Sequence, residues 1–528
     1  MSKKIMSSCF MKLFYALVLL LSNAAGPVLS AEIKCIESER QALLNFKQSL
    51  LHDYGMLSTW RDGDNNTDCC KWRGIQCHDE TGHIQLLDLH GDRYADAQYL
   101  EGSINLTSLI DLHNIQHLDL SNNFFLGSHI PEELIGSFTN LTYLNLSYSR
   151  FEGSIPCELG KLTHLQYLDL RNNYLYGELP FQLGNLTHLQ YLDLSSNDLN
   201  GEIPYQVGNI SQLRYLDLSG NSFSGALPFQ VGNLPFLHTL GLAENFDVKS
   251  KDAEWFSNLY SLTILRLDSF RNLGSSHHWL QIINKLFRNL RELRLVDCSL
   301  SDTDLQSLFY SGSNFSSSLA ILDLSYNMLT SSSFQLLLNI SLNLQELYLS
   351  HNNIVFSSSF FPSFPSLVIL DLSYNNMTSS VFQGGFYFGS KLQNLYLLNC
   401  SLMDRSFLMS SASIMNYSSS LVSLYLSSNL LKSSTIFYWL FNSTSNLRSL
   451  YLYYNMLEGP IPDGFGKMMN SLEVLDLHDN KLQGKIPSFF GNMSRLQILD
   501  LSNNKLNGEI SSFIENSSWE LIVSEICS

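Results

Sequence analysis

The feature that most constrains this chain is a repeated pattern, Leu-x-x-Leu-x-Leu-x-x-Asn, which runs from about residue 115 onward. Four consecutive copies begin 24 residues apart, at Leu141, Leu165, Leu189 and Leu213. A fixed period of this length predicts a solenoid, because each copy can bury its leucines only between two neighbouring copies. The chain length of 528 residues therefore predicts a long stack of repeats and not several compact domains.

The leucine spacing is typical of leucine-rich repeats, in which each copy contributes one short strand. The predicted fold is an α/β-type solenoid: a right-handed superhelix with a concave parallel sheet, a mostly 3-10 or irregular convex side, and a helical, disulfide-bonded N-terminal cap. We count 17 repeats, from Ile84 to the copy that begins at Leu496. The predicted division is a signal peptide (1–31), a cap (32–83), regular repeats (84–236), irregular repeats of 23 to 29 residues (237–446), regular repeats (447–510) and a non-repeat tail (511–528).

The Asn at the ninth position of the repeat has a predicted backbone role. Its buried amide can satisfy peptide groups of the tight turn after each strand, which would otherwise be unpaired inside the stack. Twelve of the 16 copies from Ile115 onward keep this Asn, and the other four place Ser149, Phe270, Cys298 and Cys400 there. We interpret the two cysteines as buried thiols and not as redox or metal-binding groups.

The first 31 residues have the pattern of a secretory signal. Lys3 and Lys4 precede an apolar run from Leu13 to Leu21, which is too short to span a bilayer as an anchor. We expect no membrane segment after it. The formal net charge of -17, without a Lys/Arg block, argues against a nucleic-acid partner.

Asn-x-Ser/Thr sequons support passage through the secretory pathway. Asn399 also lies in a sequon, but it is the least expected to carry a glycan because it is predicted to lie inside a repeat core. The expected glycosylation sites are Asn65, Asn105, Asn140, Asn145, Asn185, Asn209, Asn314, Asn339, Asn376, Asn416, Asn442, Asn492 and Asn516.

The segment before the repeats is predicted to seal the first one. Ser38 and Gln41 form a possible capping box for a helix that presents Leu43, Phe46 and Leu50 on one face. In an exported chain, four clustered cysteines predict two disulfides with three possible connectivities. Zinc is disfavoured because no histidine pair lies nearby in ligand spacing. The four cysteines are Cys35, Cys69, Cys70 and Cys77.

The cap ending Cys69-Cys70-Lys71-Trp72-Arg73-Gly74-Ile75-Gln76-Cys77, followed by repeats with Asn-x-Leu-x-Gly-x-Ile-Pro turns, resembles the extracellular part of plant leucine-rich-repeat receptors. The irregular middle, with Leu295-Val296-Asp297-Cys298-Ser299-Leu300, resembles receptor-like proteins of the type that perceives fungal ethylene-inducing xylanase. This resemblance implies disulfides Cys35–Cys69 and Cys70–Cys77. It also implies recognition of a protein, peptide or glycan elicitor in plant defence, at the cell surface, with a receptor kinase as partner.

Side chains that flank the inner leucines of each strand are predicted to face the concave surface. Repeated aspartates there are interpreted first as solvated surface and second as ligand contacts. Exposed tyrosines are stronger candidates, because Tyr offers a large amphipathic contact area and is enriched in binding hot spots. The candidate ligand-binding residues are Tyr348, Tyr396, Tyr425, Tyr451, Tyr453, Tyr167, Tyr191, Tyr215, Asp169, Asp193 and Asp217.

The sequence favours a binding protein over an enzyme. It has no Gly-x-Ser-x-Gly elbow, no His-Glu-x-x-His pair and no phosphate-binding loop, so we predict no catalysis, cofactor or metal. The alternative is a soluble secreted inhibitor of a microbial wall-degrading enzyme, or a decoy, since the pattern is also similar to polygalacturonase-inhibiting proteins. Trp519 to Ser528 is predicted to fit no further repeat, and the chain is expected to be truncated before a C-terminal cap and membrane helix. If it is complete as written, an extracellular, apoplastic location is expected.

Overall fold

The computed structural model describes residues 34–61, 68–92, 98–104, 106–226, 228–245, 247–249, 256, 258–270, 273, 277–309, 318–340, 342–356, 364–377, 391–407, 420–443, 446–507 and 520–522. The expected signal peptide lies outside these residues. By their contacts the residues divide into an N-terminal unit, Met1–Phe151, and a C-terminal unit, Glu152–Ser528.

The N-terminal unit begins with the cap. Helix α2 (Glu37–Gln48) buries Leu43 and Phe46 fully, as predicted. The capping-box prediction for Ser38 and Gln41 is wrong: the N-cap is Ile36, two residues earlier, and the helix starts at Glu37, so Ser38 already lies in its first turn. Leu50 lies beyond the helix end and is half-buried.

Buried polar groups and two disulfides join this helix to the first strands, β1 (Ile75–Cys77) and β2 (Ile84–Asp88). Glu39, with 2% of its surface exposed, accepts from the backbone N–H of Ile84 at 2.7 Å, so the helix supplies an acceptor to the strand edge. The disulfides pair Cys35 with Cys69 and Cys70 with Cys77, which confirms the pairing implied by the resemblance.

The remaining N-terminal unit contains the first repeats. Strands β2, β3 (His117–Asp119) and β4 (Tyr143–Asn145) pair in parallel. The 3-10 turn η2 (Leu106–Leu109) connects β2 to β3, and helix α3 (Glu132–Ser137) connects β3 to β4, whereas the 3-10 turn η1 (Cys69–Lys71) precedes β1 in the cap.

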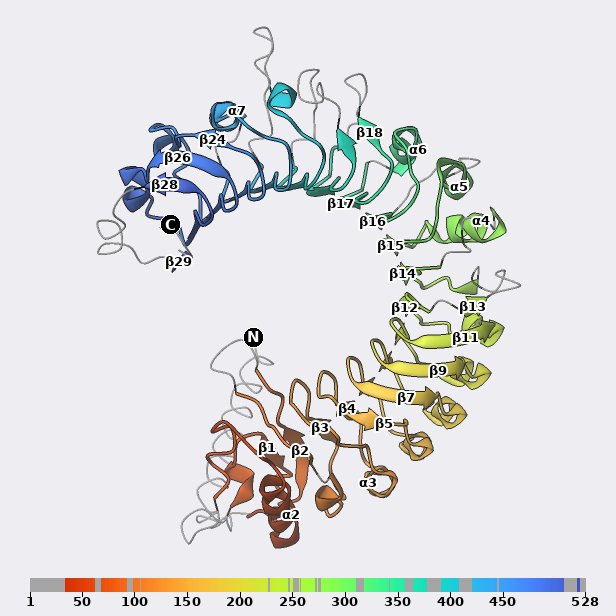
Figure 1. The fold of residues 1–528 in the computed structure, drawn as a ribbon. Coiled ribbons are helices and arrows are strands. Elements are labelled where there is room, and N and C mark those ends of the chain that lie inside the picture. Colours follow the sequence, from red (N-terminus) through yellow and green to blue (C-terminus); the bar gives the residue numbers. More distant parts are fainter. Residues whose placement is uncertain are drawn as a thin grey trace, which may run out of the picture. The chain divides into compact units, whose positions relative to one another are not determined.

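The C-terminal unit is built on one long parallel sheet whose neighbouring strands pair leucine to leucine. These strands lie along the inner, concave side of the unit (Figure 1). They are β6 (Tyr167–Asp169), β8 (Tyr191–Asp193), β10 (Tyr215–Asp217), β12 (Thr239–Gly241), β14 (Ile264–Arg266), β15 (Glu292–Arg294), β16 (Ile321–Asp323), β17 (Glu346–Tyr348), β19 (Ile369–Asp371), β21 (Asn394–Tyr396), β22 (Ser423–Tyr425), β23 (Ser449–Tyr451), β25 (Val474–Asp476) and β27 (Ile498–Asp500).

The tail prediction needs a correction. Strand β29 (Glu520–Ile522) pairs in parallel with β27, and Leu521 lies opposite Leu499. These three residues therefore extend the sheet by one strand, although Trp519 to Ser528 was predicted to fit no further repeat. The sequence pattern hid this strand because only one leucine of the repeat pattern is present there.

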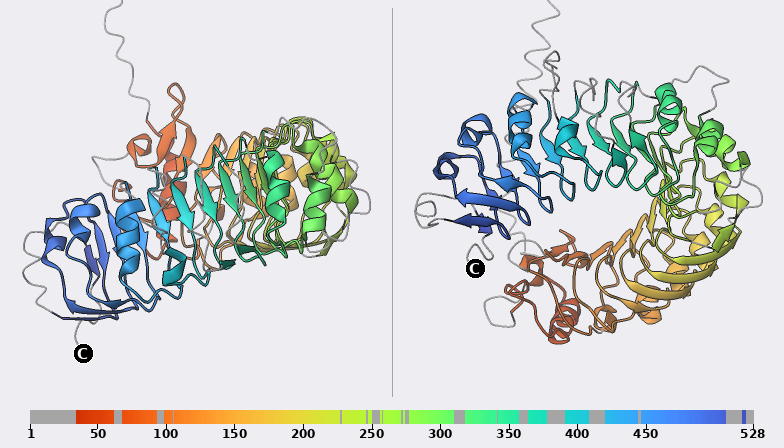
Figure 2. Two further views of the ribbon diagram at one scale, coloured as in Figure 1. Left: turned by 90° about the horizontal axis from the view of Figure 1, so that it is seen from above. Right: turned by 45° about the horizontal axis from the view of Figure 1, so that its top comes forward.

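The convex side of the C-terminal unit carries two kinds of structure (Figures 1 and 2). The regular copies add a second, shorter sheet after each turn, comprising β5 (Glu152–Gly153), β7 (Tyr174–Glu178), β9 (Asp198–Glu202), β11 (Ser222–Ala226) and β13 (Asp247–Lys249). Later copies add smaller groups, β18 (Val355–Phe356) with β20 (Asn376–Met377), and β24 (Glu458–Gly459), β26 (Lys481–Lys485) and β28 (Lys505–Asn507).

The same side carries short helices. The predicted 3-10 segments are present as η3 (Cys157–Lys161), η4 (Phe181–Asn185), η5 (Tyr205–Asn209), η6 (Phe229–Asn233), η8 (Leu338–Ile340), η9 (Asp404–Phe407) and η10 (Ser488–Asn492). In the irregular copies the longer inserts form α-helices: α4 (His277–Leu286), α5 (Asp302–Leu308), α6 (Ser333–Leu337) and α7 (Thr435–Ser443), with α8 (Phe465–Met468) in the next copy. The second sheet and the α-helices were not predicted.

The repeated Asn has the predicted backbone role. Asn197 is typical: its Nδ2 donates to the carbonyls of Leu194 at 3.1 Å and of Leu170, in the preceding copy, at 3.0 Å. Its Oδ1 accepts from the N–H of Leu175 at 3.1 Å, so one amide joins two copies. Cys298 and Cys400 stand in the same ladder, donating to the carbonyls of Leu267 and Leu372 at 3.2 Å each, and both are fully buried.

We predict that Asn197→Ala lowers the free energy of unfolding by about 1–3 kcal/mol or more, because it leaves buried peptide groups unpaired. Urea or thermal unfolding would measure the change. Gln190→Ala is the control, since this exposed side chain lies in the same copy and should change stability by less than about 0.5 kcal/mol. Equal effects of the two substitutions would contradict the role of the ladder.

Candidate functional site: the concave face of the C-terminal unit

The first three strands of the C-terminal unit carry a tyrosine ladder. Tyr167, Tyr191 and Tyr215 occupy equivalent positions, and successive ring centroids lie 4.3 Å apart with interplanar angles of 9° and 12°. Strand pairing in register places these rings directly beside one another. The structure therefore brings these three predicted residues together as one stacked surface.

The aspartates two residues further along are buried, which corrects their interpretation as solvated surface. Asp169 is 0% exposed, Asp193 1% and Asp217 6%. Each accepts the backbone N–H two residues later, at 3.1, 3.0 and 2.9 Å, and so closes the turn after its strand. The phenol groups of the ladder also donate to these carboxylates, at 3.2 to 3.4 Å.

Burial changes the titration of this row. The pKa of Asp169 is raised to about 6, mainly by burial and then by the charge of Asp193, while Arg171 opposes the change. Burial also raises the pKa of Asp193. Arg171 lies 3.4 Å from Asp169 and 3.6 Å from Asp193. Closely spaced carboxylates thus share one guanidinium, and they are internal groups of the sheet with little surface for a ligand.

On β14 and β15, an ionic cluster of Arg266, Glu292 and Arg294 takes the place of the tyrosines and aspartates. Glu292 accepts from Arg266 at 3.1 Å and from Arg294 at 2.7 Å, and Arg266 also lies 3.7 Å from Asp217. Burial raises the pKa of Glu292, but the two guanidiniums outweigh it and hold the pKa below its usual value. This cluster contains no predicted site residue.

A second tyrosine ladder follows on β21, β22 and β23. The rings of Tyr396, Tyr425 and Tyr451 are stacked, with centroids 4.3 and 4.4 Å apart and interplanar angles of 15° and 6°. All three are half-buried. The positions beside them carry Asn394, Ser423 and Ser449, so these rings have uncharged neighbours where the first ladder has aspartates.

Tyr348 does not belong to this ladder, contrary to its grouping with the other tyrosines. In the register of the sheet, Asp371 lies between Tyr348 and Tyr396. The phenol of Tyr348 donates instead to Glu346, at 2.9 Å. One repeat with aspartate at this position therefore separates Tyr348 from the ladder.

Tyr453 extends the second ladder at a right angle. Its ring is 6.4 Å from that of Tyr451 with an interplanar angle of 88°, and it stacks on His478 at 4.8 Å and 7°. Sequence reasoning missed His478 and Tyr454, which makes an edge contact with His478 at 5.2 Å. Tyr453 and His478 each follow the third leucine of their repeat pattern, Leu452 and Leu477. An alignment of the copies at this position would have placed the two residues side by side.

A third aromatic row was also missed. Tyr326, His351 and Tyr374 stack with centroids 3.9 Å apart, and all three have left-handed backbone, with φ of 58°, 53° and 57°. They occupy the residue before the ladder Asn, where the turn needs this backbone. The row is exposed at Tyr326 and Tyr374, with exposed fractions of 52% and 42%.

The burial of Asn145 and the exposure of Asn399 contradict the glycosylation expectations for these two sequons. Asn145 is 9% exposed and donates to Asp119 at 3.0 Å, so its amide is not accessible in the folded unit. Asn399, in contrast, is an exposed turn residue with φ of 48° and is not inside a repeat core. Asn140, Asn185, Asn209, Asn376 and Asn492 are exposed. Asn65, Asn105, Asn314, Asn416 and Asn516 lie outside the described residues, as do the side chains of Asn339 and Asn442.

Several family models of leucine-rich repeats match parts of this chain. A leucine-rich repeat region covers residues 181–384, a leucine rich repeat N-terminal domain covers 36–78, and a pair of leucine rich repeats covers 470–515. Single leucine rich repeats match 114–137, 140–162, 164–186 and 446–468.

Two curated relatives come from tomato, Solanum lycopersicum. Receptor-like protein EIX2 is 45% identical over 149 residues, covering 27% of this chain and 14% of the relative. Receptor-like protein EIX1 is 44% identical over 131 residues, covering 24% of this chain and 12% of the relative. The chain is a leucine-rich-repeat protein, and part of it is similar to plant receptor-like proteins.

A solved structure of a plant receptor ectodomain has a similar fold. The ectodomain of the Arabidopsis receptor kinase HAESA, in complex with an extended IDA peptide hormone, has a TM-score of 0.52 and 26% identity. The similarity covers 89% of this chain and 82% of that structure. Across the described residues of the chain, we find no helix with the length and apolar character needed to cross a membrane.

The buried aspartate row predicts a pH-dependent stability. Because the pKa of Asp169 is raised to about 6, above its usual 3.8, the folded state takes up this proton before the unfolded state as pH falls. The wild-type chain should therefore gain stability from about pH 6 down to about pH 4. Asp169→Asn should be more stable than wild type at neutral pH, by up to about 3 kcal/mol, with the gap closing at acid pH.

Urea unfolding at several pH values would measure this difference. The control is Asp198→Asn, which changes an exposed carboxylate on β9 and should leave the pH slope of wild type intact. A constant gap between Asp169→Asn and wild type at every pH would show that Asp169 does not titrate in this way.

Proposed function

We propose that this chain is an extracellular recognition module of a plant receptor-like protein, and that it binds a protein or peptide elicitor on the concave face of its C-terminal unit. The observation that carries the proposal is the ladder of Tyr396, Tyr425 and Tyr451, continued by Tyr453. It offers stacked, half-exposed aromatic rings on a rigid sheet.

The physical argument concerns the cost of ordering a binding surface. Tyrosine buries a large area with few rotatable bonds, and neighbouring rings already hold one another in place by stacking. A ligand therefore meets a preorganised surface and loses little conformational entropy of the receptor. Tyr is also enriched among the residues that dominate interface energies.

The comparisons support the same role at the level of protein class. The tomato relatives are receptor-like proteins, and the HAESA ectodomain, which shares the fold, was solved with a peptide hormone. The aligned parts cover only 14% and 12% of those relatives, so the activity of the whole receptors is not transferred directly. For this chain, defence signalling through a partner receptor kinase at the cell surface is part of the proposal.

The test uses the full chain, immobilised, and a library of random linear peptides displayed on phage. We expect selected peptides to bind wild type and to lose about tenfold or more of their affinity for Tyr425→Ala and Tyr451→Ala, since each removes a central ring worth at least about 1.4 kcal/mol. Titration by biolayer interferometry would measure the affinities.

The matched control is Tyr438→Ala. Tyr438 is 56% exposed but lies on the convex helix α7, so its removal should leave peptide binding unchanged. If the selected peptides bind the two ladder variants as tightly as wild type, the ladder is not the recognition surface.

A further inference from the structure

Beside the second tyrosine ladder, seven side chains of three consecutive copies form a cluster that combines aromatic rings with carboxylates. We call it the His478 corner. It comprises Tyr451, Tyr453, Tyr454, Asp476, His478, Asp479 and Asp500. Strands β23, β25 and β27 align Tyr451, Asp476 and Asp500 in register, and the other four residues lie in the turns that follow β23 and β25.

The rings of Tyr451 and Tyr454 stand at steep angles to the ring of Tyr453. Tyr453 lies flat against His478, while Tyr451 meets Tyr453 at 88° and Tyr454 meets it at 78°. Tyr454 is 58% exposed and Tyr453 is half-buried. A group that enters this corner can therefore contact ring faces from more than one direction.

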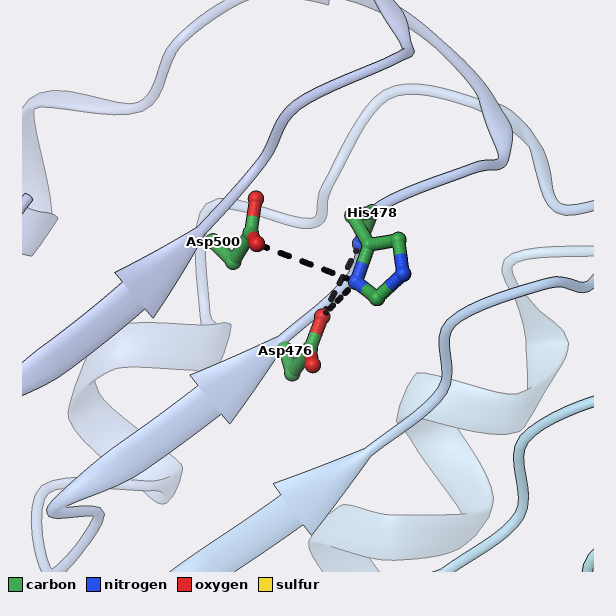
Figure 3. A group of neighbouring side chains, drawn as sticks. All are labelled: Asp476, His478 and Asp500. Atoms are coloured by element: carbon green, nitrogen blue, oxygen red, sulfur yellow. Dashed lines mark hydrogen bonds and ion pairs between the residues drawn. The ribbon is translucent and has the colours of Figure 1, made fainter. Parts of the chain in front are cut away.

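The carboxylates of Asp476 and Asp500 lie on the Nδ1 side of the His478 imidazole (Figure 3). Its Nδ1 lies 2.6 Å from Asp476 and 3.8 Å from Asp500, and its Nε2 lies 3.6 Å from Asp479. Three carboxylates thus face a single imidazole, so even a protonated His478 leaves an excess of negative charge. Their side chains are 16%, 16% and 29% exposed for Asp476, Asp500 and Asp479, which leaves them within reach of a ligand.

The strand and turn positions of these three copies, residues 447–455, 472–480 and 496–504, hold one permanent positive charge. That charge belongs to Arg448, whose guanidinium lies 3.3 Å from the carboxylate of Glu473. Lys481, after the turn of the middle copy, lies 3.9 Å from Glu458. The excess of carboxylate charge in the His478 corner therefore has no lysine or arginine of its own face to neutralise it.

We propose that the His478 corner binds a lysine or arginine side chain of the ligand. This inference rests on the function proposed above and specifies it further: the concave face selects a basic segment. Carboxylates attract the cationic head, and tyrosine faces stabilise it by cation–π interaction, which strengthens as the cation is desolvated. The negative potential of the corner also steers a basic ligand to the adjacent tyrosine ladder.

The same atoms could be considered for a metal ion, since ligand atoms of Asp476, His478 and Asp500 lie within 4.8 Å of one another. The walls of the corner favour an organic cation. Ring faces of Tyr453 and Tyr454 offer no oxygen or nitrogen ligand to a hard ion, whereas they contact the methylene groups and head of Lys or Arg well.

The test compares wild type with the double variant Asp476→Asn/Asp500→Asn. Both aspartates accept a turn N–H through Oδ1, at 3.2 and 2.9 Å, and Asn145 accepts the equivalent N–H in the same way at 3.1 Å. Asparagine therefore preserves the turn while it removes the charge. Asp198→Asn, an exposed site on the convex strand β9, is the matched control.

The probe is a peptide selected from the random library on the full wild-type chain, together with a version in which Gln replaces every Lys and Arg. We expect the selected peptides to be enriched in Lys or Arg. The double variant and the Gln peptide should each weaken binding about tenfold, and Asp198→Asn should not change it. With wild type alone, raising the salt concentration should weaken the basic peptide several-fold and leave the Gln peptide unchanged.

The outcomes separate this inference from the function on which it rests. Selected peptides that depend on Tyr425 but lack basic residues, or that bind the double variant as wild type, overturn the cation site and leave the tyrosine surface standing. Binding that depends on neither Tyr425 nor the aspartates overturns both. Stoichiometric binding of Zn²⁺ or Ca²⁺, measured by calorimetry and lost in Asp476→Asn, would show an inorganic cation site and overturn the inference.

Discussion

The hydrogen bonds of the repeated Asn are the interaction on which the rest of this structure depends. A turn that reverses the chain after a three-residue strand leaves peptide groups inside the stack, where water cannot reach them. One side-chain amide satisfies groups of its own turn and of the preceding copy, so it also holds two copies at a fixed distance. Where Cys298 or Cys400 replaces Asn, a thiol donates to the preceding copy instead, and the spacing continues.

This fixed spacing determines what the concave face can present. Neighbouring strands lie about 4.7–4.9 Å apart, which is close to the separation of stacked rings. Consecutive tyrosines at one repeat position must therefore stack, as Tyr396, Tyr425 and Tyr451 do. One repeat with aspartate in place of tyrosine is enough to end a ladder. Asp371 separates Tyr348 from Tyr396 in this way. Binding surfaces on such a sheet arise from runs of similar residues, and their limits are set by single exceptions.

The repeat pattern predicted the sheet, the register and the Asn ladder, because each follows from a spacing visible in the sequence. The predictions that failed concern what covers a side chain. Asp169 and Asn145 occupy outward positions of their strands, yet phenol groups, a guanidinium or a neighbouring carboxylate enclose them. Asn399 was expected inside the core and is exposed in a turn. The capping box at Ser38 failed for a related reason: the motif specifies a local bond, whereas the start of α2 places Ser38 inside the first turn.

The two tyrosine regions show that residue type alone does not determine function. Near β8, tyrosines and aspartates of the same copy bond to each other, the carboxylates are buried, and their raised pKa values reflect a lack of solvent. Near β25, the tyrosines lie in one copy and the aspartates in the next, so the carboxylates stay partly exposed beside ring faces. The same chemical groups therefore stabilise the sheet at one end and remain available for a cation at the other. The tyrosine occupies a different repeat position in these two regions: near β8 it precedes the strand leucine, whereas Tyr451 follows it. This difference is visible once the copies are aligned in the register of the sheet.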